Sequence, residues 1–379
     1  MIQAQPGEAK APSPLRSAGA LQKLRTFVDG EVSRAEDGGV LFWGSVMRCL
    51  SILIFFISLC VGFTAPSRFV VDDDEYLDKI VNACGSLQKQ GKLKSLQVLR
   101  EQVHTKGHSV SLLSPSREKL SAPEICERLR ESTLSVGSYY KCPDCGEWHF
   151  NSSSGFVVGS DGIVATCCHV ITAEDEGVKE SYLAVADASG HVFPVQSVLA
   201  ADTESDTCFV KIDAHNLKPL ALRLEALTGE RVYCLSHPGG NHFMFTDGMI
   251  ARVNRRRDEL PDDKGRTNSN SALTRPILFL NITAEFAPGS SGAAVVDESA
   301  NVVGQVSSIA ELGEPAMGDD TNAAMPSVPI RFCVAAEEIV RLTKPHLKAE
   351  PVVFTPKATP RHGAHSSTNQ PVKVPSNRS

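Results

Sequence analysis

The spacing of apolar residues before residue 133 is helical. Apolar side chains recur at intervals of three and four over 77–87 and again over 93–103, which predicts a short helical hairpin broken near Gly91. A third helix is expected over 121–129, because "SAPEICERL" places a serine three residues before a glutamate, the pattern of a capping box.

The pattern changes to that of short β-strands between residues 133 and 342. Runs such as "SGFVVGSDGIVAT" and "PILFLNITAE" alternate with turns that contain Gly, Asp and Ser, as in all-β sandwiches and barrels. The helical period returns in "CVAAEEIVRL", over 333–342, and we expect a final helix there. Residues 346–379 hold five prolines and few apolar residues, so a disordered tail is expected.

An apolar run lies near the start of the chain, over 49–63, with Arg48 just before it. Its fifteen residues are short for a membrane span, which needs about 20, and match the apolar core of an export signal. A start at Met47 would give an ordinary signal peptide, whereas a start at Met1 makes a membrane anchor possible. The run predicts export to the periplasm or cell envelope.

Four segments follow from these patterns. We expect a leader with a signal peptide or membrane anchor over 1–66, a helical segment over 67–125, a folded domain over 126–345 and a disordered tail over 346–379. The net charge of −6, spread over 22% charged residues, offers no basic surface for nucleic acid, which is therefore not an expected partner.

Three short stretches of the strand-rich region hold the side chains that nucleophilic hydrolysis needs. His169 ends "SSGFVVGSDGIVATCCH", Asp206 begins the apolar strand of "DTCFVKI", and Ser291 lies in "APGSSGAAV". A serine hydroxyl becomes a nucleophile when an imidazole takes its proton and a carboxylate orients that imidazole. Asp202 is the other candidate carboxylate, and Asp206 is preferred because its strand would hold it beside the imidazole.

These stretches resemble the chymotrypsin-like serine peptidases, most closely the HtrA/Deg branch. The resemblance covers about 130–342 and extends to "LSHPGGNHFMFTDGMIARV" and "VVGQVSS". It implies an all-β fold of two six-stranded antiparallel β-barrels, near 130–215 and 220–342, preceded by the helical segment, with the site in the cleft between the barrels. It also implies an exported serine endopeptidase that acts on protein or peptide substrates through an acyl-enzyme, without a cofactor.

The resemblance assigns further roles around the serine. Gly289 and Ser291 would supply the N–H groups of the oxyanion hole, although Ser290 and Ala293-Ala294 depart from the family's usual residues. Glu285 lies where an acidic residue would favour Lys or Arg before the cleaved bond, unless it faces solvent. Only 37 residues follow residue 342, so a PDZ module is not expected.

The stretch "KCPDCGEWHF" leaves three alternatives open. The strand that turns at 159–162 should return Cys167 toward Cys142 and Cys145, and chymotrypsin-like enzymes often have a disulfide there. A zinc site of Cys142, Cys145, His149 and Cys167 is the second alternative, and free buried thiols are the third. No metal is assigned.

Two histidines lie in the stretch "LSHPGGNHFMFTDGMIARV" but are not assigned to the proposed site. His237 and His242 flank a Pro-Gly-Gly turn and are expected to be turn or surface residues. The competing function is a binding or scaffold protein of the cell envelope, built on a catalytically weak or inactive protease fold. The oligomeric state is left open.

Overall fold

The computed structural model describes residues 68–103, 107–173, 176–258, 272–312 and 328–343. The chain divides into one unit over 1–67 and a second over 68–379, and every described residue belongs to the second. The expected leader over 1–66 and tail over 346–379 lie outside the described residues.

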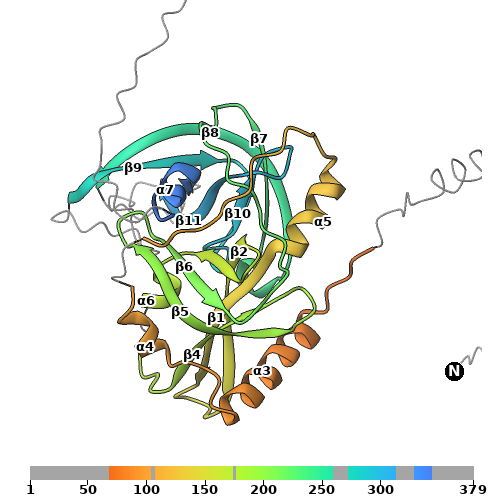
Figure 1. Ribbon diagram of the computed structural model, residues 1–379, viewed down its shortest axis with the longest axis vertical. Helices are drawn as coiled ribbons and strands as arrows, with labels where there is room; N and C mark the ends of the chain where they lie inside the picture. Colours follow the sequence, from red (N-terminus) through yellow and green to blue (C-terminus); the bar gives the residue numbers. More distant parts are fainter. Residues whose placement is uncertain (1–67, 104–106, 174–175, 259–271, 313–327, 344–379) are drawn as a thin grey trace, which may run out of the picture. The chain divides into compact units, whose positions relative to one another are not determined.

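The first β-barrel confirms the expected all-β architecture (Figure 1). Its six strands pair antiparallel and close in the order β1-β2-β3-β6-β5-β4. Closure leaves no unpaired strand edge, which removes a surface prone to aggregation. The strands are β1 (Thr133–Lys141), β2 (Trp148–Gly159), β3 (Ile163–Thr166), β4 (Ser181–Ala186), β5 (Val192–Asp202) and β6 (Thr207–Ile212).

The second barrel has the same number of strands, closed in the order β10-β11-β12-β9-β8-β7. Both barrels of the predicted double-barrel fold are therefore present. The strands are β7 (Arg231–Ser236), β8 (Met244–Asp258), β9 (Ala272–Ile282), β10 (Ala294–Val296), β11 (Val302–Leu312) and β12 (Val328–Ala335).

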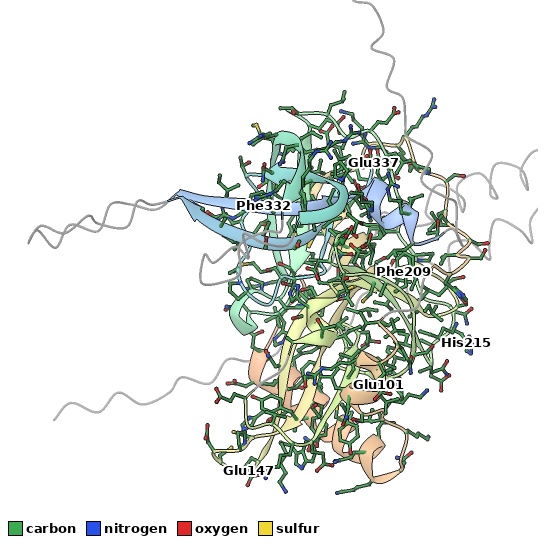
Figure 2. The ribbon with its side chains drawn as sticks, turned by 90° about the vertical axis from the view of Figure 1, so that its left-hand side faces the viewer. Glu101, Glu147, Phe209, His215, Phe332 and Glu337 are labelled. Atoms are coloured by element: carbon green, nitrogen blue, oxygen red, sulfur yellow. The ribbon has the colours of Figure 1, made fainter. Side chains whose placement is uncertain are left out.

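Apolar side chains fill the interior of each barrel. Val136, Val164 and Val210 belong to the core of the first barrel, and Val232 and Val295 to that of the second. A further cluster holds buried residues from both barrels and from the helices that precede them. Figure 2 shows side chains from both barrels around the labelled Phe209, which is fully buried. Burial of this apolar surface is the main term that favours the fold.

Five α-helices and one 3₁₀ turn lie outside the strands in the described residues. They are α3 (Asp73–Lys89), α4 (Leu96–Arg100), α5 (Ala122–Ser132), α6 (His169–Thr172), η1 (Pro238–Gly240) and α7 (Ala336–Arg341). Helix α3 buries Tyr76, Ile80 and Cys84, which lie on one face, and contacts the first barrel through β2 and β5. None of the helices in these residues combines the length and the apolar character needed to cross a bilayer.

Two helix predictions need correction. The helix expected over 93–103 is limited to α4, because residues 101–103 form a turn. The helix expected over 333–342 begins only at Ala336, since Cys333–Ala335 extend β12 and pair with β11. The predicted capping box of α5 is present: the Ser121 N–H donates to the Glu124 carboxylate at 2.7 Å.

Candidate active site

His169 and Asp206 face each other on the first barrel. The distance from His169 Nδ1 to Asp206 Oδ2 is 2.7 Å, and the His169 backbone N–H donates to Asp206 Oδ1 at 2.9 Å. Asp206 has a φ of +54°, a left-handed conformation that aspartate adopts more readily than most residues. Two bonds to one carboxylate fix both the backbone and the ring of His169.

This pairing changes the basicity of the imidazole. Burial disfavours the charged ring and lowers the pKa of His169, but the charge of Asp206 and its hydrogen bond outweigh burial, so the pKa is raised above its ordinary value. With Nδ1 bonded to the carboxylate, Nε2 is the nitrogen available to accept a proton from a nucleophile.

The two adjacent serines have different environments. Ser290 is fully buried, and its Oγ lies 3.0 Å from Ser236 Oγ and accepts from the Ala287 N–H at 3.4 Å. Ser291 is only partly buried, and its Oγ donates to the Ser307 carbonyl at 3.5 Å. Of the two hydroxyls, that of Ser291 is the accessible one.

Ser307, on β11, joins the two halves of the site. Its carbonyl accepts from Ser291, and its Oγ donates to Asp206 Oδ2 at 3.2 Å. Sequence reasoning quoted the "VVGQVSS" stretch but did not single out Ser307. Among the described residues, no hydrogen bond joins Ser291 Oγ to His169.

The loop that carries the serine depends on a left-handed glycine. Gly289 has a φ of +95°, and a Cβ there would lie 2.4 Å from the His237 carbonyl oxygen. The Pro288 carbonyl accepts from the Gly239 N–H at 2.7 Å. Because a trans peptide points its N–H away from its C=O, the Gly289 N–H is directed away from Gly239.

Two backbone donors remain available in this loop. Within the part of the chain that the structure describes, the N–H groups of Gly289 and Ser291 have no acceptor. Ser154 of β2 supports the loop from the first barrel, because its N–H donates to the Ser291 carbonyl at 3.0 Å and its Oγ to the Gly289 carbonyl at 3.0 Å. The arrangement can offer two donors to an anionic oxygen.

A second supporting residue comes from the N-terminal helical segment. Arg100 of α4 donates from Nε to the Ile171 carbonyl at 3.0 Å and from its terminal nitrogen to the Ala173 carbonyl. These carbonyls end α6, which begins with His169. Sequence reasoning missed Arg100, because nothing local links it to residues about 70 positions later.

The other sequence candidates lie apart from the His169 imidazole. Asp202 pairs with Arg275 and accepts from the Glu204 N–H at 3.1 Å, so its carboxylate is engaged elsewhere. The Glu285 side chain is 80% exposed, with the Arg331 guanidinium 3.8 Å away. A role of Glu285 in substrate selection stays a prediction.

The surface placement predicted for His237 and His242 is wrong. Both residues flank the 3₁₀ turn as expected, yet both are buried. Burial lowers the pKa of His237 to about 3, and its Nδ1 accepts from the Phe243 N–H at 3.1 Å. His242 Nδ1 lies 3.0 Å from Asp73 Oδ1 on α3, a partner 169 residues away that no local pattern indicates.

The predicted proximity of Cys167 to Cys142 and Cys145 is also wrong. All three are free thiols, and the buried Cys167 bonds to the Val306 carbonyl at 3.2 Å, in a group with His169 and Asp206. Cys142 and Cys145 lie in the hairpin just before Trp148, where β2 begins, whereas Cys167 follows the last residue of β3. The start of β2 extends about six residues, roughly 20 Å at 3.3 Å per residue, beyond the level at which β3 ends. Neither the disulfide nor the four-ligand zinc site forms.

The comparisons with known proteins agree with this architecture. Residues 153–304 match the family model described as a trypsin-like peptidase domain. The chain therefore contains a trypsin-like peptidase domain, and its relatives belong to the HtrA/Deg serine proteases.

Three relatives illustrate the similarity. The probable periplasmic serine endoprotease DegP-like of Halomonas elongata is 28% identical over 40% of this chain and 28% of its own length. The chloroplastic Protease Do-like 1 of Arabidopsis thaliana is 28% identical over 40% and 32%, and the putative serine protease HhoB of Synechocystis sp. is 26% identical over 55% and 45%. The chain thus spans less than half the length of these relatives.

One solved structure, titled "HtrA-type protease AlgW with tripeptide", is 21% identical to this chain. It covers 58% of this chain and 62% of its own, with a TM-score of 0.41.

Proposed function

We propose that this protein is a serine endopeptidase whose nucleophile is Ser291. The observation that carries the proposal is the 2.7 Å contact between His169 Nδ1 and Asp206 Oδ2, with the accessible Ser291 hydroxyl held by Ser307, which also bonds to Asp206. This arrangement lies within a domain whose relatives are serine proteases.

The reaction assigns one role to each group. Ser291 Oγ attacks the carbonyl carbon of the scissile peptide bond while His169 Nε2 takes its proton. The imidazolium then gives that proton to the leaving amine, and water repeats the sequence on the acyl-enzyme. Asp206 holds the ring in the required tautomer and stabilises its charged form.

The backbone stabilises the charge that develops on the substrate oxygen. The N–H groups of Gly289 and Ser291 are the donors proposed for the oxyanion hole, because both are without an acceptor among the described residues. Loss of one such donor typically lowers turnover by about 10²- to 10³-fold.

The hydrolysis of an unfolded protein such as casein tests this function. The full chain should release peptides, and Ser291→Ala should abolish the release. Ser290→Ala is the matched control, because it removes a hydroxyl from the adjacent buried position and should retain hydrolysis. The scaffold hypothesis predicts no release by the unsubstituted chain, and equal loss in both variants would contradict the choice of nucleophile.

Export to the periplasm or cell envelope is proposed from the apolar run over 49–63 and from relatives named as periplasmic. Fractionation of cells that produce a tagged chain tests this proposal: export predicts the tag in the envelope fraction, accessible to added protease, and recovery only from the cytosol contradicts export.

A further inference from the structure

The hairpin between β1 and β2 has a tight and regular geometry. Lys141 pairs with Trp148 across the ladder, and the Cys142 N–H donates to the Glu147 carbonyl at 2.9 Å. The Gly146 N–H donates back to the Cys142 carbonyl at 3.1 Å, and Gly146 has a φ of +74° that suits glycine. Strand pairing and turn bonds therefore fix the six-residue loop 142–147 at both ends.

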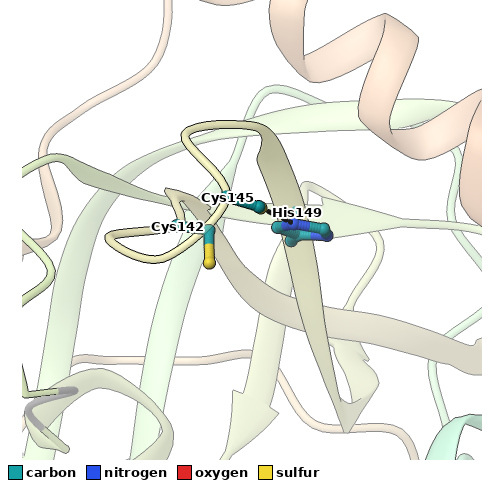
Figure 3. A group of neighbouring side chains, drawn as sticks. All are labelled: Cys142, Cys145 and His149. Carbon is teal, nitrogen blue, oxygen red and sulfur yellow. Dashed lines mark hydrogen bonds between the residues drawn. The ribbon is translucent and has the colours of Figure 1, made fainter.

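This loop brings three ligand-type side chains together at the surface. One ligand atom from each of Cys142, Cys145 and His149 lies within 4.8 Å of the other two. The Cys145 Sγ is 3.1 Å from the His149 Nε2, the contact drawn in Figure 3. Cys145 and His149 are exposed and Cys142 is partly exposed, so an ion can reach all three from solvent.

The three side chains belong to one short stretch of the chain. The two cysteines and the histidine come from eight consecutive residues of one hairpin, so the set is assembled before any ion binds.

We propose that Cys142, Cys145 and His149 bind one Zn²⁺ ion through two sulfur atoms and one nitrogen. Zinc–sulfur bonds of about 2.3 Å in a tetrahedron put two sulfur ligands about 3.7 Å apart. The ligand atoms of the three residues already lie within 4.8 Å of one another, so small side-chain rotations bring them to this spacing. Within the described part of the chain this group contains no fourth ligand, so water completes the tetrahedron. Binding to two thiols and a neutral imidazole releases up to two protons.

The types of ligand favour Zn²⁺ over Mg²⁺ and Ca²⁺. Thiolate and imidazole select zinc and its soft relatives, whereas Mg²⁺ and Ca²⁺ require oxygen. The site differs from the one considered from sequence, because Cys167 is not a ligand. It lies at the start of β2, before Ser154, the residue in the middle of that strand that supports the serine loop. None of its three ligands belongs to the proposed catalytic site, so the proposal does not depend on the proposed peptidase activity.

Metal titration of the full chain tests the proposal. The protein, with any histidine tag removed, is reduced, freed of metal and titrated with Zn²⁺ and separately with Co²⁺. We expect about one ion per chain, with the thiolate charge-transfer and ligand-field absorption of tetrahedral cobalt. Cys145→Ser and His149→Ala should each weaken binding by at least about 10- to 100-fold, since even residues that only support ligands have effects of that size.

Cys126→Ser is the matched control, because it removes a partly buried thiol from α5, away from the hairpin. This variant should bind zinc as the unsubstituted chain does. Absence of the cobalt spectrum at one equivalent, or equal affinity in Cys145→Ser and Cys126→Ser, would overturn the assignment. Circular dichroism of each variant shows whether it is folded, so a lost site is distinguished from a lost fold.

Discussion

The Gly289→Ala substitution tests whether the serine loop supplies an oxyanion donor. Gly289 has a φ of +95°, where a side chain costs about 1–2 kcal/mol. The new Cβ would lie 2.4 Å from the His237 carbonyl oxygen, inside the 3.0 Å below which such contacts are essentially absent. The loop must therefore move by about 0.6 Å or more, and misplacement of about 1 Å can lower a rate by 10²-fold.

Gly229→Ala supplies the matched control. Gly229 has nearly the same φ, +94°, but no atom lies within 4 Å of the position where its Cβ would stand. Both variants carry the backbone cost, and only Gly289→Ala has the collision. The difference between them isolates the displacement of the loop from the general loss of stability.

The assay is the rate of labelling by a fluorophosphonate, which reacts with an activated serine and places charge on a phosphoryl oxygen. Gly289→Ala should be labelled about 10²- to 10³-fold more slowly than Gly229→Ala, the usual effect of losing one oxyanion donor. Equal rates in two folded variants would refute the argument that the Gly289 N–H acts on the reacting oxygen.

Three further predictions follow from the site. Asp206→Asn should lower kcat/KM by about 10⁴-fold. The acid limb of its pH–activity profile should move to lower pH, because activity needs neutral His169 and the lost carboxylate no longer raises the imidazole pKa. An acid limb that does not move contradicts this prediction. Arg100→Ala removes the donor to the Ile171 carbonyl and should destabilise the fold by about 1–3 kcal/mol, measured by denaturant unfolding, with slower labelling. Glu285→Gln should reduce any preference for Lys or Arg by about fivefold at most, since the carboxylate is exposed, and an unchanged cleavage profile contradicts a role in selection.

The sequence predicted those features that are encoded by short local patterns. The strand periodicity indicated an all-β sandwich or barrel, and the resemblance to chymotrypsin-like peptidases implied the two barrels that the structure contains. The three stretches around His169, Asp206 and Ser291 each carry their side chain at a strand end or loop. The choice of Asp206 over Asp202 rested on the apolar strand that follows it, and the structure places Asp206 beside the imidazole.

Features that depend on distant partners could not be predicted in this way. The backbone N–H of His242 donates to the carboxylate of Asp73 on α3, which holds His242 in its buried position. His237 is buried with its ring packed against that of Phe243. The prediction that Cys167 lies near Cys142 and Cys145 failed because the polar run before Gly155 resembles a turn. This run instead continues β2 for several residues, so the hairpin with Cys142 and Cys145 lies far from Cys167. The residues "CVA" before α7 fit either period, and their pairing with β11 decides for a strand.

The central claim is that Ser291 is a nucleophile activated by His169. Peptide mapping by mass spectrometry after fluorophosphonate labelling tests it most directly. The account predicts one adduct, on Ser291, that disappears in His169→Ala while the protein stays folded. An adduct on Ser290 or another serine, or labelling of Ser291 that is unchanged in His169→Ala, would contradict it.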